Sequence, residues 1–161
     1  MINHLINLFK LRIGVIMAIT GLVALIITPG QSVNVWQAAL LAVTVLIASG
    51  SAGAFNQYYE RDYDKLMKRT ANRPFVTGRF SSDNPVWLFI IFGMLIVSVG
   101  AAGFLLNGLS ALFIFLGAFF YAIVYTVWLK RRSWTNIIIG GASGSFAVLA
   151  GAAVVDPSLG P

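Results

Sequence analysis

The sequence predicts an all-α integral membrane protein that crosses the bilayer with five helices. Of its 161 residues, 58% are hydrophobic and only 10% are charged, and the mean hydropathy is +0.86. An ordinary soluble domain carries about 25% charged residues, and a disordered chain is poor in apolar residues. The composition therefore excludes both a water-soluble enzyme and a disordered protein.

Five charge-free apolar stretches provide the second observation, because each is close to the roughly 20 residues that a helix needs to cross a bilayer. The first is short, but the flanking Lys10 and Arg12 can extend toward the headgroups. Short links separate the spans, apart from one long polar loop at residues 56–85. The spans are expected at residues 13–28, 35–55, 86–106, 109–129 and 136–155.

The distribution of basic residues is the third observation. With five spans, all eleven lie in the N-terminal segment, the second link or the fourth link, on one side of the membrane. By the positive-inside rule that side is the cytoplasm, so we expect a cytoplasmic N-terminus in the inner membrane. A signal peptide at residues 10–28 is the alternative, but no small-residue cleavage motif follows it. The eleven are Lys10, Arg12, Arg61, Lys65, Lys68, Arg69, Arg73, Arg79, Lys130, Arg131 and Arg132.

Several kinds of site are excluded by residue counts. The chain has no cysteine and a single histidine, His4, so thiolate and multi-histidine metal sites cannot form within it. The sequence stops on a polar turn at residues 156–161, directly after the last span. We therefore expect the chain to be a piece of a longer protein.

The long polar loop contains most of the charge. Residues 56–83 hold ten of the sixteen charged residues. No Gly or Pro occurs between residue 56 and Pro74, so the second span is expected to continue as a helix for two or three turns. At about 100° per residue, Asn56, Glu60 and Asp64 share one narrow stripe, whereas Asp62 points away from it.

Like charges are segregated on this expected helix. Acidic residues lie on one stripe, beside Gln57, and a second stripe carries Arg61, Lys65 and Arg69. Like-charge pairs at i,i+4 are unfavourable, so the acidic stripe favours a cation and the basic one an anion. Mg²⁺ bound by both protein oxygens and phosphate satisfies both. The alternative is a solvated cytoplasmic helix with no ligand.

A second polar cluster at residues 125–136 returns Lys130, Arg131 and Arg132 to the same membrane face. These cations could bind a diphosphate, heme propionates or anionic lipid headgroups. Tyr125 lies one turn inside the membrane, where it could face the site or join an aromatic belt. Two runs of small residues, 49–54 and 140–144, favour close helix packing. No nucleic-acid partner is expected, and the oligomeric state stays open.

Both polar segments resemble the signatures of the UbiA-type intramembrane prenyltransferases, and within them the heme O synthases. Residues 56–78 read N-xxx-E-x-D-x-D-xx-M-x-RT-xx-RP-xxx-G, and residues 125–144 read YT-xx-LKR-xxx-TN-xx-IGG-xx-G. The chain differs from the pattern at Leu11, Gln57, Ala147, Val148 and Ala152. A second acidic motif and about four further helices of the nine-helix bundle are absent. The resemblance therefore covers the first half of such an enzyme.

This resemblance implies farnesyl transfer from farnesyl diphosphate to a vinyl group of heme B, giving heme O. It implies a single transmembrane domain over residues 1–161 whose active-site loop is residues 56–85, and little activity for this chain alone. The rivals are a quinone or chlorophyll precursor as acceptor, and, less favoured, a transporter or structural subunit. The implied roles are Mg²⁺ ligation by Asn56, Glu60 and Asp64, diphosphate binding by Lys68, Arg69, Arg73, Lys130 and Arg131, and stabilisation of the farnesyl cation by Tyr125.

Overall fold

The secondary structure is all helical in the computed structural model, which describes residues 2–81 and 84–158. Asp83 of the predicted loop and residues 159–161 of the predicted C-terminal turn lie outside the described residues. The elements are α1 (Ile2–Leu8), α2 (Leu11–Ile27), α3 (Val35–Asp64), α4 (Val86–Leu105), α5 (Gly108–Phe119), the π-helix η1 (Phe120–Leu129) and α6 (Asn136–Val155).

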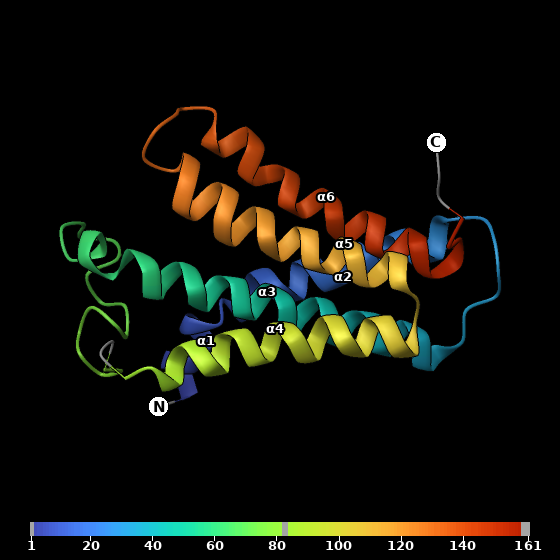
Figure 1. Ribbon diagram of the computed structural model, residues 1–161, viewed down its shortest axis with the longest axis horizontal. Coiled ribbons are helices and arrows are strands. Elements are labelled where there is room, and N and C mark those ends of the chain that lie inside the picture. Colours follow the sequence, from blue (N-terminus) through green and yellow to red (C-terminus); the bar gives the residue numbers. More distant parts are fainter. Residues whose placement is uncertain (1, 82–83, 159–161) are drawn as a thin grey trace.

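Five helices pack side by side along the length of the molecule (Figure 1). Their contacts form a closed ring, because each of α2, α3, α4 and α5 contacts a neighbour that follows it in the chain and α6 contacts α2. The apolar core contains Leu41, Val45, Ile114 and Val154. A smaller aromatic cluster around Phe75 joins α1, α3 and α4 at one end of the bundle.

Four helical segments are long and apolar enough to cross a membrane: α3, α4, α5 with η1, and α6. The fifth, α2, is apolar but only 17 residues long. It begins at Leu11, two residues before the expected start, because Lys10 ends the preceding turn. Residues 109–129 are not the single α-helix that the sequence predicts, since the second half is π-helical. The short α1 was not predicted.

Local hydrogen bonds define the helix starts. Asn34 and Gln37 form a reciprocal capping box at the start of α3, with N···O distances of 2.9 and 3.1 Å. Asn107 caps α5 by accepting from Ser110 N at 2.7 Å, and its amide also donates to Ala153 O on α6. One side chain therefore starts a helix and joins it to its neighbour.

Close contacts between small residues hold the ring together. Ser51 and Ser98 each donate to a backbone carbonyl across the α3–α4 interface at 2.7 Å. On α6, a Cβ added to Gly151 would lie 2.0 Å from the Gly21 carbonyl oxygen. Small residues that bring backbones together are the usual basis of helix association in a membrane. The tightest approach therefore lies outside the small-residue runs at 49–54 and 140–144.

The polar segments gather at one end of the bundle. Three polar segments lie together on the left of Figure 1: residues 2–10, residues 65–81 and the turn at residues 130–135. The uncharged links lie at the opposite end. This arrangement agrees with the charge distribution expected from the sequence.

Candidate functional site

One face of α3 forms both an apolar wall and a polar site. Toward the middle of the bundle this face carries Val45, Ser49 and Ala52 along a cavity. It continues toward the charged end with Asn56, Glu60 and Asp64. The helix extends to Asp64, as predicted from the absence of Gly and Pro, so the polar stripe forms on a continuous helix.

This stripe faces into the protein. Asn56, Glu60 and Asp64 are 1%, 3% and 3% exposed, which argues against a simple solvated helix. Charged side chains are almost never fully buried unless they are paired. Each of the three has a basic partner from a different part of the chain.

The middle position of the stripe joins three elements. Glu60 Oε2 accepts a hydrogen bond from Asn56 Nδ2 at 3.0 Å and forms an ion pair with Lys130. Asn56 also donates to Thr126 Oγ1 at 3.1 Å, so α3 is tied to η1 as well as to the turn after it. The predicted approach of the two polar segments is therefore present.

The outer position holds the segment that follows α3. Asp64 Oδ2 accepts from Arg73 Nη1 at 2.5 Å, and Thr70 Oγ1 donates to the Asp64 carbonyl at 3.0 Å. The chain therefore folds back over the end of the helix. Phe75, which is buried beside Tyr58 and Trp87, anchors this return.

Lys10 occupies the inner position, a role that sequence reasoning missed. Its Nζ donates to Asn56 Oδ1 at 2.8 Å and to Tyr121 Oη at 2.7 Å. Burial, together with the nearby positive charges of Arg73 and Lys130, lowers the pKa of Lys10 to about 8. The sequence signal for this role is a lysine directly before an apolar helix, a pattern that equally fits a headgroup anchor.

Other predicted residues lie outside this cluster. Lys68 and Arg69 are exposed. The expected basic stripe of Arg61, Lys65 and Arg69 does not form, because α3 ends at Asp64 and the next residues turn. The helix cannot continue there while Thr70 and Arg73 fold back onto its last residue.

Two further predicted residues have partners on the outer surface of α3. Asp62 is exposed and pairs with Lys65 at 3.0 Å, consistent with its expected direction away from the acidic stripe. The Arg131 guanidinium carbon lies 3.1 Å from the ring centroid of Tyr63. Tyr63 is 50% exposed, so Arg131 is placed on this outer surface instead of beside Glu60.

The π-helix carries two stacked tyrosines, of which Tyr121 faces Lys10 inside the bundle. Tyr121 and Tyr125 stack with ring centroids 5.4 Å apart, and Lys130 Nζ lies 5.7 Å from the Tyr125 ring centroid. Lys130 N bonds to Tyr125 O at the end of η1, an i→i+5 contact typical of a π-helix. Such segments occur frequently at functional sites. On α6, Gly140 leaves the space that the Tyr125 ring needs.

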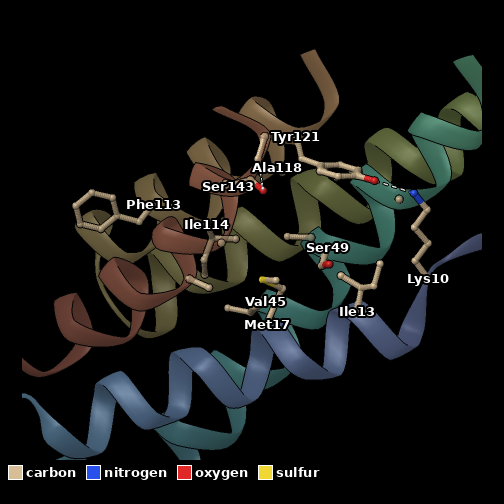
Figure 2. A pocket seen from close by; sticks show the side chains of 18 residues that line it. Lys10, Ile13, Met17, Val45, Ser49, Phe113, Ile114, Ala118, Tyr121 and Ser143 are labelled. Carbon is tan, nitrogen blue, oxygen red and sulfur yellow. Dashed lines mark hydrogen bonds between the residues drawn. The ribbon is translucent and has the colours of Figure 1, made fainter. Parts of the chain in front are cut away.

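A cavity of about 250 Å³ opens beside Lys10. Figure 2 shows Lys10 and Tyr121 bonded at one end and Phe113 at the other, with Met17 and Val45 along one side. Gly140, Gly141, Ser143 and Gly144 line the α6 side, so this run of small residues makes room for a cavity as well as for packing. The cavity is mostly apolar, and its polar end adjoins the cluster on α3.

The donor chemistry of the cluster fits a hard cation bound together with an anion. Carboxylate and amide oxygens are the protein ligands that Mg²⁺ accepts, usually beside substrate phosphates. Among the described residues, no three His, Cys, Asp or Glu side chains are grouped for a metal; the third oxygen donor on this stripe is the amide of Asn56. The adjacent cations Lys10, Arg73 and Lys130 suit the anionic partner.

Comparison with known proteins identifies the family. Residues 17–161 match the UbiA prenyltransferase family. The chain belongs to this family.

Several relatives of this UbiA-family chain are protoheme IX farnesyltransferases. Two proteins of that name from Paramagnetospirillum magneticum are 50% and 46% identical to it over 157 and 154 residues, covering 98% and 94% of the chain. One from Bartonella quintana is 40% identical over 150 residues, or 92% of the chain. The matches cover 54%, 52% and 47% of these relatives, so the chain spans about half their length. No solved structure matches it significantly.

Proposed function

We propose that this chain supplies the diphosphate-binding half of a protoheme IX farnesyltransferase. The reaction is transfer of the farnesyl group of farnesyl diphosphate to a vinyl group of heme B, which yields heme O. The observation that carries this proposal is the junction of a buried, oxygen-rich and cation-rich cluster with an apolar cavity. A ligand with an anionic head and an apolar chain fits that combination, and the names of the relatives supply the two substrates.

The head group has a defined set of candidate partners. Asn56, Glu60 and Asp64 would hold Mg²⁺, which supplies charge neutralisation on the diphosphate when bound. Arg73 and Lys130 would add hydrogen bonds to the phosphate oxygens, since both already lie against the carboxylates. Arg131 is omitted from this set because it lies on Tyr63. Lys68 and Arg69 are omitted because they are exposed and lie outside the buried cluster.

The bond chemistry follows from the placement of the head group. The C1–O bond of farnesyl diphosphate breaks, and its electron pair leaves with the diphosphate, whose charge the cations stabilise. The vinyl π electrons of heme B then form the new bond to C1, and water adds to the remaining vinyl carbon with loss of a proton. An apolar cavity protects the allylic cation from earlier capture by water. Tyr125 presents an aromatic ring that would stabilise this cation.

The membrane arrangement is part of the same proposal. The chain would form five spans corresponding to the first half of a nine-helix bundle, with its N-terminus and charged end at the cytoplasmic side of the inner membrane. Three of the five acidic residues lie in one acidic motif at residues 56–64, and the other two, Asp83 and Asp156, lie singly in the sequence. We therefore expect the 161 residues alone to bind the head group but to transfer little or no farnesyl.

A chimera tests this function. This chain would replace the aligned half of the Paramagnetospirillum relative that is 50% identical to it, and farnesylated heme would be measured by chromatography and mass. We expect turnover that falls by about 100-fold or more in Glu60→Gln and Asp64→Asn, as for other losses of transition-state electrostatics. The matched control is Asp62→Asn, whose carboxylate is exposed on the same helix.

The same assay separates the competing interpretations. Prenylation of an added hydroquinone instead of heme would indicate the other acceptor class. Full activity in the Glu60 and Asp64 variants would contradict the assignment of the site to this face of α3.

A further inference from the structure

The backbone and the side chain of Lys10 are both fixed by neighbouring residues, which distinguishes it from the other two cations of the site, Arg73 and Lys130. It lies between α1 and α2 with φ 47°, and it is the one non-glycine residue with positive φ among the described residues. This conformation is unfavourable for a side chain with a Cβ. Such strain persists where the surrounding structure enforces it, and it is concentrated at functional sites.

The aliphatic part of Lys10 packs against Gly53 of α3. A Cβ added to Gly53 would lie 3.3 Å from each of the Cβ, Cγ and Cδ atoms of Lys10. The absence of a side chain at Gly53 therefore lets the methylenes lie against the helix backbone. Gly53 is one turn before Asn56, so the ammonium group is directed to the inner end of the polar stripe.

Gln57 fixes the backbone that leads into Lys10. It is 3% exposed, and its amide donates to Asn7 O at 2.6 Å and to Leu8 O at 3.3 Å. Both carbonyls belong to the last turn of α1, two and three residues before Lys10. Residues 53, 56 and 57 of α3 therefore hold the stem, the ammonium group and the preceding backbone of one lysine.

The three cations of the site follow the order of their acceptors along α3. Lys10 contacts Asn56, Lys130 contacts Glu60 and Arg73 contacts Asp64. Because four residues of helix rise about 6 Å, Lys10 lies innermost. It is also the cation that lines the cavity, where it bonds to Tyr121 (Figure 2).

We propose that Lys10 is a substrate-binding, specificity-determining residue that contacts the phosphate joined to the apolar chain. It therefore selects a diphosphate that carries a chain over one that does not. This inference rests on the proposed function. It adds that Lys10, and not Arg73 or Lys130, binds the ligand where the head group joins the apolar chain. On binding, Lys10 exchanges its hydrogen bond to Tyr121 for one to the phosphate, which opens the mouth of the cavity.

Binding by the whole 161-residue chain in lipid nanodiscs tests the proposal. The probes are Mg²⁺ with S-farnesyl thiolodiphosphate, Mg²⁺ with inorganic pyrophosphate, and farnesol, each followed by calorimetry. Lys10→Met should weaken binding of the farnesyl thiolodiphosphate by about 10- to 100-fold, the range expected for a lost charge-assisted hydrogen bond. Binding of pyrophosphate should weaken less than binding of the thiolodiphosphate, and farnesol should bind the variant as tightly as it binds the wild type.

Three further variants provide the controls. Arg12→Met removes an exposed cation two residues away and should change the Kd by less than about twofold. Lys10→Arg keeps the charge and should recover most of the affinity. Gly53→Ala displaces the methylenes of Lys10 without changing any charge, so it should weaken binding of the thiolodiphosphate. In the Lys10→Met background the same substitution should cause no further loss of affinity.

The outcomes separate the two proposals. Unchanged thiolodiphosphate binding by Lys10→Met would overturn the role of Lys10, and it would leave the proposed function intact if Glu60→Gln and Asp64→Asn still lose binding. Loss of farnesol binding as well would assign Lys10 a purely structural role and also overturn the proposal. Absence of thiolodiphosphate binding by the wild-type chain would contradict both.

Discussion

Lys130 pairs with Glu60 although 70 residues separate them in the sequence. The Glu60 side chain is 4% exposed and that of Lys130 is 29% exposed, so this contact joins the turn after η1 to the buried face of α3. It completes the charged end of the bundle, because the carboxylate of Glu60 would otherwise be enclosed without a cation.

Removing one partner of the Lys130–Glu60 ion pair should lower the free energy of unfolding more than removing both partners. Lys130→Met leaves the buried Glu60 carboxylate unpaired and should lower the free energy of unfolding by about 2 kcal/mol. Adding Glu60→Gln should recover most of that loss. Denaturant unfolding in detergent micelles measures both, with Arg132→Met, an exposed cation of the same turn, as the control. An equal loss in Arg132→Met, or no recovery in the double variant, would contradict the ion-pair explanation.

Arg131 should stabilise the same turn through the ring of Tyr63. Tyr63→Leu removes the ring and should cost about 0.5–1 kcal/mol of unfolding free energy, the usual size of an exposed cation–π contact. Tyr63→Phe retains the ring and should be neutral. In an Arg131→Met background Tyr63→Leu should have no further effect, as measured by a double-mutant cycle. Equal losses from Leu and Phe would instead point to the hydroxyl group.

Gly151 should be intolerant of even one added methyl group. Gly151→Ala would place Cβ 2.0 Å from Gly21 O, where only movement of the backbone can relieve the clash. We expect a loss of about 1–3 kcal/mol, typical of overpacking, despite the better helix propensity of alanine. Gly141→Ala on the same helix is the matched control, because its Cβ would meet open space. Thermal unfolding in micelles compares them, and similar melting temperatures would refute the packing role.

Phe113 should limit the length of the chain that the cavity accepts. It lies at the end of the cavity opposite Lys10 (Figure 2), so Phe113→Ala should shift the binding preference toward a geranylgeranyl over a farnesyl thiolodiphosphate by about tenfold. Phe115→Ala is the control, since Phe115 is exposed and outside the cavity lining. The ratio of the two dissociation constants is the measurement, and an unchanged ratio would place the end of the chain elsewhere.

Hydrophobic periodicity and charge predicted the helix bounds closely where the local sequence alone sets them. The expected span at residues 136–155 coincides with α6, and the second span continues to Asp64 as expected. Elsewhere, contacts with distant segments of the chain set where a helix ends. The expected basic stripe fails because Arg73 and Thr70 fold back onto the last residue of α3.

The amino-acid sequence by itself determined an apolar helical chain, the grouping of its basic residues at one end and the stripe formed by Asn56, Glu60 and Asp64. These properties depend on composition and on the 3.6-residue repeat of a helix, which can be read without knowledge of neighbours. Tertiary structure alone decided which cation meets each acceptor. A side chain's partner depends on where distant backbone segments meet, so the inner position of Lys10, the pairing of Lys130 with Glu60 and the placement of Arg131 on Tyr63 follow only from the packed bundle.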